Sequence, residues 1–189
     1  MREVRAQRSA PWVAASPGVR VLPPAARYIL RGDEAVRRAV GAAFGVEVPA
    51  SACRALSASA GRGAGAGERS ALWLGPDEWL LLAPEHEAGA VETELAHALM
   101  GLPHSLVDVS HRQVALAAEG SQAALLLSAG CPLDLAESAF PVGMCTRTML
   151  AKAEIVLWRT SSQAFRLEIW RSFAAYVSQF LAEAARGVI

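Results

Sequence analysis

The hydrophobic pattern of the second half of the chain repeats that of the first half, displaced by 86 residues, the offset between Trp79 and Phe165. Apolar residues that alternate as in a strand recur at this offset, and so do apolar residues at helical spacing. Two copies indicate a duplicated domain and not an extended solenoid. The matched positions are Tyr28 with Val114, Leu30 with Leu116, Val40 with Leu126, Leu72 with Trp158, Trp79 with Phe165, Leu81 with Leu167, Val91 with Val177, Leu95 with Leu181 and Ala98 with Ala184.

The first half predicts one β-α-β-β-α-β unit over residues 27–110. Turn-forming residues at Gly75–Glu78 separate two runs rich in aromatic and branched side chains, which is typical of a β-hairpin. Asp33 is a suitable N-cap, since its carboxylate can accept hydrogen bonds from the free amides of a first helical turn. The predicted elements are a strand over Tyr28–Leu30, a helix over Asp33–Phe44, a hairpin over Ala71–Leu82, a helix over Val91–Met100 and a strand over His104–Val109.

The second half predicts the same order over residues 111–189. We therefore expect an α+β fold of two ferredoxin-like units that form one compact domain. Residues 1–26 precede them and are predicted to form an irregular amino-terminal arm, because they contain four prolines. The elements predicted for the second unit are a strand over Arg112–Ala118, a helix over Ser121–Ala129, a hairpin over Met149–Trp158 and Phe165–Trp170, and a helix over Ser172–Arg186.

The last helix carries an apolar stripe that must be buried against its own sheet or against another chain. Burial against its own sheet is the better supported of these two. The tryptophans are likewise expected in core or interface surfaces, where their large rings contribute much burial. The stripe consists of Phe173, Tyr176, Val177, Phe180, Leu181 and Ala184, and the tryptophans are Trp73, Trp79, Trp158 and Trp170.

Residues Ser57–Gly67 (SASAGRGAGAG) are low in complexity and are predicted to form a mobile loop. Their alternating glycines do not predict nucleotide binding, because no Gly-Lys-Ser/Thr follows and no apolar strand precedes them. No Gly-x-Gly-x-x-Gly motif follows a predicted strand elsewhere. Binding of FAD or NAD by this chain alone is therefore not expected.

Composition narrows the function classes. The 189 residues are 53% hydrophobic and carry 18 basic and 18 acidic side chains, so a globular protein without an overall positive field is expected, and nucleic acid is a poor partner. Arg2, Arg5 and Arg8 are interpreted as a solvated tail. The sequence has no apolar segment typical of a secretory signal or a membrane span, which predicts no membrane association and a cytoplasmic protein.

The candidate reactive groups favour structural roles. Cys53, Cys131 and Cys145 lack Cys-x-x-Cys spacing and are expected to be reduced, buried thiols. A pKa of the Cys145 thiol lowered by Arg147 is the alternative, but no base is identifiable. The four histidines include no His-x-x-x-His pair, so no metal site is predicted.

Asp108, Ser110 and His111 bring a carboxylate, a hydroxyl and an imidazole into a short run. Neighbouring residues of a strand point to opposite faces, whereas a catalytic triad needs convergence. We therefore interpret them as junction residues between the two halves and predict no catalytic residue.

Four motifs resemble the gamma subunit of heterotetrameric sarcosine oxidase and occur in the same order as in that family. The resemblance spans about Arg27–Arg186. A fifth segment, Asp108–His111 (DVSH), is similar to aminomethyltransferases of the folate-binding fold. The four motifs are Leu72–Leu80 (LWLGPDEWL), Gly130–Leu135 (GCPLDL), Gly143–Thr148 (GMCTRT) and Arg171–Tyr176 (RSFAAY).

This resemblance implies an accessory, non-catalytic subunit with a folate-binding aminomethyltransferase-like fold. The larger subunits would oxidise sarcosine to glycine and transfer the one-carbon unit to tetrahydrofolate. It also implies alpha, beta and delta partner subunits, with FAD, FMN, NAD and tetrahydrofolate held there and no cofactor in this chain. Whether this chain counts as an enzyme is left open. Arg147, Arg159 and Arg171 are the candidate interface anchors.

Two alternatives remain open at this point. One is a free-standing folate-binding, aminomethyltransferase-like one-carbon protein. Such enzymes resemble this chain through Gly120, Leu125 and Gly143, but the stretch that carries their folate aspartate corresponds to Lys152–Leu157 (KAEIVL), which has no aspartate and offers only Glu154. The other is a related complex that acts on another N-methyl amino acid.

Overall fold

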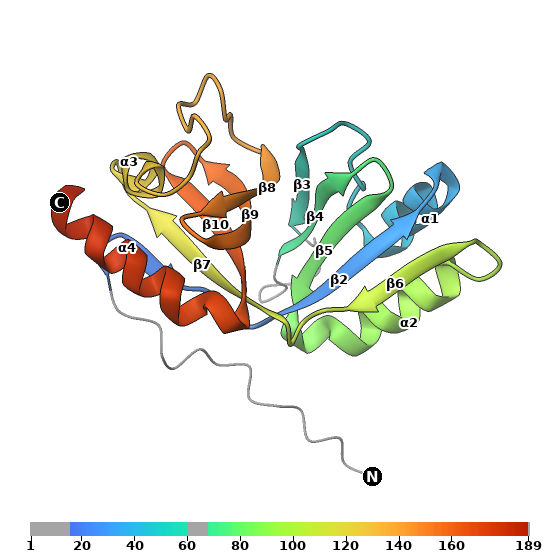
Figure 1. Cartoon of the computed structure of the whole chain (residues 1–189). Coiled ribbons are helices and arrows are strands. Elements are labelled where there is room, and N and C mark those ends of the chain that lie inside the picture. Colours follow the sequence, from blue (N-terminus) through green and yellow to red (C-terminus); the bar gives the residue numbers. More distant parts are fainter. Residues whose placement is uncertain (1–15, 60–67, 189) are drawn as a thin grey trace, which may run out of the picture. The chain divides into compact units, whose positions relative to one another are not determined.

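The computed structural model describes residues 16–59 and 68–188 (Figure 1). The described chain divides into two compact units. The amino-terminal unit comprises Ala25–Ser110 together with Gly143–Thr146, and the carboxy-terminal unit comprises residues 16–24, His111–Val142 and residues 147–188. The architecture is mixed α+β, built on two five-stranded sheets whose paired strands run antiparallel.

The sheet of the amino-terminal unit has the strand order β3-β4-β5-β2-β6. Strands β4 and β5 form the hairpin expected from the turn at Gly75–Glu78, which is confirmed. The N-cap is also confirmed, since the Asp33 carboxylate accepts a 3.0 Å hydrogen bond from the amide of Val36. The elements in chain order are β2 (Ala25–Gly32), α1 (Glu34–Phe44), β3 (Ala55–Ser59), β4 (Glu68–Gly75), β5 (Glu78–Pro84), η1 (Glu85–Glu87), α2 (Ala88–Ala98) and β6 (His104–Asp108).

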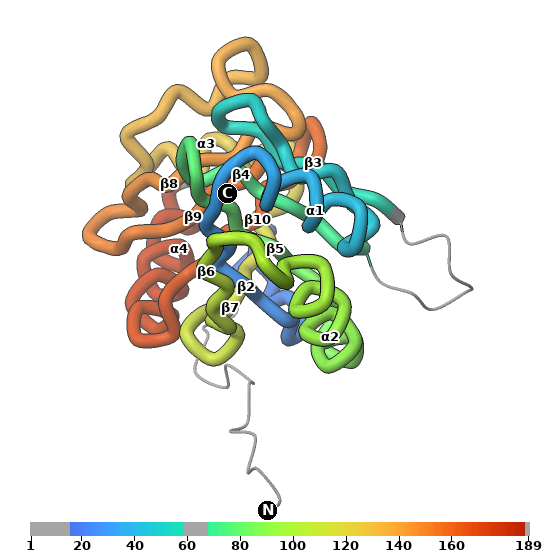
Figure 2. Tube along the Cα trace, turned by 90° about the vertical axis from the view of Figure 1, so that its right-hand side faces the viewer, coloured from blue at the N-terminus to red at the C-terminus, as the bar shows by residue number. Residues whose placement is uncertain are grey.

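Helices α1 and α2 supply one side of the core of this unit, and their paths are followed in Figure 2. Side chains alternate along β2, so every second one points toward the helices. The i, i+4 spacing of apolar residues in α1 and α2 places them on the helix faces that pack against these side chains. The core therefore contains residues of both kinds of element. Its fully buried members include Tyr28, Leu30 and Leu81 from the strands and Val36, Val40, Phe44, Val91 and Leu95 from the helices.

The sheet of the carboxy-terminal unit has the strand order β1-β7-β10-β9-β8. Strand β10 pairs antiparallel with both β7 and β9. Helices α3 and α4 contact each other in this unit. The elements in chain order are β1 (Val19–Val21), β7 (Gln113–Glu119), α3 (Ala123–Ser128), β8 (Cys145–Leu150), β9 (Ala153–Ser161), β10 (Ala164–Trp170), η2 (Arg171–Phe173) and α4 (Ala174–Val188).

The amino-terminal arm is not irregular throughout, so that part of the prediction is wrong. Residues 1–15 lie outside the described residues, but Val19–Val21 forms β1 and pairs with β7. Gly18 makes the turn before this strand, with φ +70°, and a Cβ there would lie 2.9 Å from the carbonyl oxygen of Glu119. The amide of Glu119 donates to the carbonyl of Gly18 at 2.7 Å, which attaches the arm to the sheet.

Strand β1 also explains a second difference from the prediction. A final strand was expected after the last helix of the second unit, yet between Trp170 and Val188 the structure has only η2 and α4. The place beside β7 is taken by β1, as the place beside β2 is taken by β6. Strand β3 overlaps the predicted Ser57–Gly67 loop, of which residues 60–67 lie outside the described residues.

Residues matched at the 86-residue offset agree in burial. Eight of the nine matched pairs are buried in both units, and Ala98 and Ala184 are both partly buried. The stripe of the last helix follows the prediction only in part. Val177 and Leu181 are fully buried, whereas Phe173 and Tyr176 are exposed.

Candidate functional site

Asp108, Ser110 and His111 do not converge. The Asp108 carboxylate accepts a 2.7 Å hydrogen bond from the Ser110 amide, and the Ser110 hydroxyl accepts a 2.9 Å hydrogen bond from the amide of Arg27. Ser110 is 2% exposed, while His111 is exposed and belongs to the carboxy-terminal unit. The first contact shapes the turn after β6 and the second fastens this turn to β2, so the run holds backbone in place where the chain leaves the amino-terminal unit.

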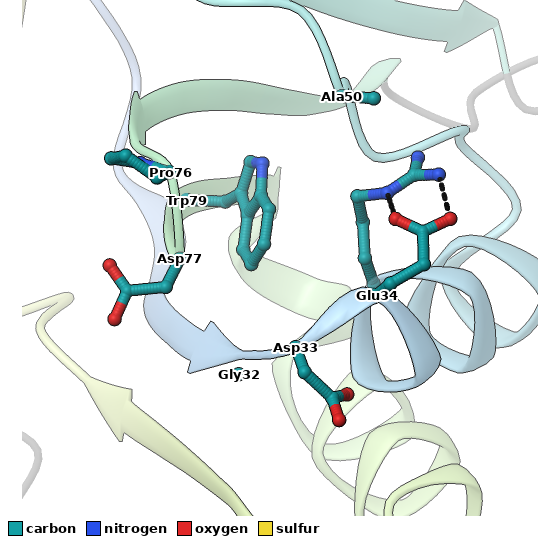
Figure 3. A pocket seen from close by; sticks show the side chains of 8 residues that line it. Gly32, Asp33, Glu34, Ala50, Pro76, Asp77 and Trp79 are labelled. Atoms are coloured by element: carbon teal, nitrogen blue, oxygen red, sulfur yellow. Dashed lines mark hydrogen bonds and ion pairs between the residues drawn. The ribbon is translucent and has the colours of Figure 1, made fainter.

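A pocket of about 260 Å³ lies at the start of α1 (Figure 3). Arg37 donates two hydrogen bonds to the Glu34 carboxylate, at 2.8 and 2.7 Å, and a third to the carbonyl of Val48 at 2.6 Å. The Trp79 indole donates to the carbonyl of Pro49 at 2.8 Å. The residues that line the pocket are Gly32, Asp33, Glu34, Arg37, Ala50, Pro76, Asp77 and Trp79.

Three carboxylates and one guanidinium line this pocket, and each of them has a partner, which for Asp77 is Arg31 at 3.5 Å. The hydrogen bond from Arg37 lowers the pKa of Glu34, and the same bond raises the pKa of Arg37. Asp33 is engaged as the cap of α1. Because these groups are already hydrogen-bonded within the protein, the pocket is a concave surface with little free hydrogen-bonding capacity for a ligand.

A buried arginine, missed by the sequence analysis, joins three elements of the amino-terminal unit. Arg69 of β4 donates to the carboxylates of Glu87 at 2.7 Å and Glu94 at 2.8 Å, and to the carbonyl of Phe44 at 3.1 Å. Its guanidinium also lies 5.3 Å from the centre of the Phe44 ring. Burial lowers the pKa of Arg69, but the hydrogen bonds that it donates to Glu94 and Glu87 outweigh burial and leave the pKa raised. The group therefore stays charged and acts as a structural clamp.

The three arginines expected at an interface lie in different environments. Arg159 is 4% exposed, donates to the carbonyls of Leu135 and Phe140 at 3.0 and 2.9 Å, and lies 4.8 Å from the centre of the Phe165 ring. Burial leaves it little surface for another chain. Arg147 is exposed and Arg171 is partly buried, and both take part in interactions.

Cys145 is a structural thiol. It is fully buried, and burial raises the pKa of its thiol to about 12, so the alternative of a lowered pKa is contradicted. Its amide donates to the carbonyl of Cys53 at 3.0 Å and its sulfur lies 3.6 Å from the carbonyl oxygen of Trp73. All three cysteines are free, and Cys131 is buried as well.

Within residues 16–59 and 68–188, no three His, Cys, Asp or Glu side chains gather as a metal site would require. No helix in the same ranges is long and apolar enough to cross a membrane. Glu154, the only acid in the stretch that corresponds to the folate element, is exposed on β9.

The four tryptophans differ in burial, and Trp73 is partly buried against the core of the amino-terminal unit. Trp79 and Trp158 are buried, whereas Trp170 is 40% exposed and lies under the guanidinium of Arg112, 5.1 Å from the ring centre. No pattern in the sequence indicated a role for Arg112. Arg112 directly precedes β7, whose first residue pairs with Trp170 of β10. This proximity follows from the strand register, which the sequence alone does not provide.

In sequence, a family model and two known proteins that match this chain all indicate the same family. The model of the sarcosine oxidase, gamma subunit family matches residues 31–187. A sarcosine oxidase subunit gamma from Arthrobacter sp. is 39% identical over 131 residues, which cover 69% of this chain and 64% of that protein. Its counterpart from Corynebacterium sp. (strain U-96) is 38% identical over 146 residues, covering 77% and 67%. The chain thus spans about two thirds of the length of these relatives.

Two solved structures agree with the sequence comparison. A chain of the heterotetrameric sarcosine oxidase from Corynebacterium sp. U-96, in complex with pyrrole 2-carboxylate, matches with a TM-score of 0.80 and 31% identity, covering 94% of this chain and 89% of that one. The aminomethyltransferase T of the glycine cleavage system from Bartonella henselae matches with a TM-score of 0.65 and 16% identity over 89% of this chain and 48% of that one, and so shares the fold. The resemblance inferred from the four motifs is confirmed, and the chain belongs to the sarcosine oxidase gamma subunit family.

Proposed function

We propose that this chain is an accessory subunit of a sarcosine oxidase type complex that converts sarcosine to glycine and transfers the one-carbon unit to tetrahydrofolate. The observation that carries the proposal is the similarity to a chain of heterotetrameric sarcosine oxidase over 94% of this chain, with a TM-score of 0.80. The partners would be the alpha, beta and delta subunits.

The larger subunits would hold FAD, FMN, NAD and tetrahydrofolate and carry out the chemistry. The geometry of this chain supports that division, because its buried arginines Arg69 and Arg159 are used within its own units. Arg69 donates hydrogen bonds to Glu87 and Glu94, and Arg159 donates hydrogen bonds to backbone carbonyls. The pocket beside Trp79, at about 260 Å³, is smaller than the ~300–1,000 Å³ typical of ligand sites.

The two units are proposed to be copies of one ferredoxin-like design, divided near Ser110. The equal burial of residues 86 positions apart and the corresponding places of β6 and β1 support this origin. A duplicated platform of this kind offers surface for docking without a site of its own. We also propose a cytoplasmic location, which the three free thiols fit.

A free-standing folate enzyme is less well supported. Its chemistry would need a carboxylate inside a cleft, whereas Glu154 is exposed on β9. The substrate of the complex, sarcosine or another N-methyl amino acid, is decided by the larger subunits in this proposal. Arg147 and Arg171 stay candidate contacts to them, and Arg159 is the least accessible of the three.

The proposal is tested by expressing this chain, with an affinity tag, together with the alpha, beta and delta subunits of the same host. We expect the tagged chain to purify with the larger subunits, with flavin absorbance and with sarcosine-dependent turnover. A parallel preparation without this chain should yield less assembled complex. Efficient assembly and full turnover without this chain, with the tagged chain eluting alone, would contradict the proposal.

A further inference from the structure

Three aromatic side chains are exposed where β10 leads into η2 and α4. Trp170, Phe173 and Tyr176 are 40%, 39% and 38% exposed, and we call these three residues the aromatic ridge. Grouped exposed rings of this size mark an interaction surface more often than single ones do. Ala174 and Val177 behind them are fully buried, so α4 is already anchored in its own core.

The amino-terminal unit offers an internal comparison. At the 86-residue offset, the bounds of β5 and η1 and the first residue of α2 correspond one for one to those of β10, η2 and α4. The inward positions agree, since Ala88 and Val91 are buried as Ala174 and Val177 are. The core contacts of this corner are therefore the same in both units.

The positions that correspond to the ridge differ between the two corners, and Glu87 at one of them is partly buried as the partner of Arg69. Pro84, Glu87 and Ala90 occupy, in that order, the places of the three aromatic residues of the ridge. The same strand, turn and helix therefore form without any aromatic ring at these positions. The rings of the ridge are therefore not needed for these elements to form.

Two cationic residues border the ridge. The guanidinium of Arg112 lies 5.1 Å from the centre of the Trp170 ring, and its carbonyl accepts a 2.8 Å hydrogen bond from the amide of Arg171. At the other end, the amide of Lys152 donates to the hydroxyl of Tyr176 at 3.4 Å. Arg112 and Lys152 are both exposed. The surface thus combines apolar rings with a guanidinium over Trp170 and an exposed lysine residue next to Tyr176.

We propose that the aromatic ridge, with Arg112 and Lys152, is the surface that binds a larger subunit of the complex. This inference rests on the proposed function. Tryptophan, tyrosine and arginine are the residue types that contribute most at protein interfaces. Charge complementarity requires carboxylates opposite the two cations. The occupant is therefore an apolar segment of a larger subunit, flanked by acidic side chains.

The first test replaces Phe173, the ridge residue without a polar side-chain atom, by the glutamate found at the equivalent place in the other unit. Phe173→Glu is compared with Leu125→Glu, which changes a 55% exposed leucine of α3 in the same unit. Binding of each tagged variant to the purified larger subunits is measured by titration. We expect Phe173→Glu to weaken binding by at least about tenfold, as for a central interface residue, and Leu125→Glu to leave it unchanged.

A second test addresses charge. Arg112→Glu should slow association by about tenfold at low salt, and Arg112→Lys should retain most of the rate, because steering depends on the sign of the charge. Circular dichroism and thermal unfolding of each free variant show whether the fold is kept. If Phe173→Glu unfolds, Phe173→Ala takes its place, because it removes the ring without adding a charge and should also weaken binding by about tenfold.

The outcomes separate this inference from the proposed function. If the unchanged chain binds no larger subunit, the proposed function fails. If the unchanged chain binds and the folded Phe173 variant binds equally well, the ridge is not the docking surface. If the free chain forms dimers that the Phe173 variant abolishes and binding to the larger subunits is unaffected, the ridge joins two copies, which also overturns the inference.

Discussion

Phe180 of α4 packs so closely over Gly130 that a Cβ at Gly130 would lie 2.6 Å from the Cζ atom of the ring. The backbone amide of Ala151 closes the other side, at 3.0 Å from the same position. Gly130 follows the short helix α3, and its amide donates to the carbonyl of Leu127. The missing side chain therefore lets the α4 ring settle against the end of α3.

Gly130→Ala is expected to destabilise the protein by about 1–3 kcal/mol, the usual cost of forcing extra atoms into a packed core. Gly89→Ala is the matched control, since nothing lies within 4 Å of a Cβ at this position in α2, and alanine there should stabilise by about 0.5–1 kcal/mol. Urea unfolding measures both. Equal stability of the Gly130→Ala variant and the unchanged chain would contradict the packing described.

Removal of the buried arginine should destabilise strongly. Arg69→Met leaves Glu87 and Glu94 without the cation that they share, and breaking such a buried pair costs about 3–5 kcal/mol. Because the two glutamates are 17% and 31% exposed, we expect a value toward the lower end. Arg186→Ala, which removes an exposed pair with Glu183, should cost at most about 0.5 kcal/mol. Similar losses for the two variants in chemical unfolding would show that Arg69 is not a clamp.

The raised pKa of Cys145 predicts a loss of stability at alkaline pH. The unfolded thiol ionises near 9 and the folded thiol near 12, so the folded state binds more protons over that window and stability falls as the pH rises through it. By pH 10 the loss from this group is about 1 kcal/mol. Cys145→Ala should remove this part of the pH dependence, and Cys131→Ala should not. Unfolding free energies at pH 8 and pH 10 that change equally in all three proteins would refute this origin.

The turn before β1 should tolerate no side chain. Gly18→Ala places a Cβ on a residue whose φ is positive, and this Cβ would lie 2.9 Å from a backbone oxygen, so a loss of about 1–2 kcal/mol is expected. Arg20→Ala, which removes only an exposed ion pair with Glu119, should lose about 0.5 kcal/mol or less. Hydrogen exchange of the β7 amides reports the same effect locally. Unchanged exchange in Gly18→Ala would mean that β1 contributes little to the sheet.

The duplicated hydrophobic pattern predicted most of the fold because burial alternates with a fixed period in strands and helices. Leu30 and Leu116, for example, are both fully buried at corresponding places. Strand β1 was missed because three residues between prolines are too short for a periodic signal. Its pairing with β7 joins segments almost 100 residues apart, and no local preference encodes such a contact.

The candidate interface residues were harder to predict. Arg159 shares the strand face of Ile155 and Leu157, so alternation along β9 already indicated an inward side chain. The exposure of Phe173 and Tyr176 could not be predicted from the sequence, because both residues belong to the apolar stripe of the last helix. Only the depth of α4 in its unit decides that Val177 is covered and these two rings are not.

Native mass spectrometry of the complex, assembled from coexpressed alpha, beta and delta subunits with and without this chain, tests the central claim most directly. With this chain present, we predict one assembly whose mass contains it together with the larger subunits, and sarcosine turnover that rises with the amount of that assembly. An assembly of the larger subunits that never contains this chain, yet turns over sarcosine at the full rate, would contradict the account.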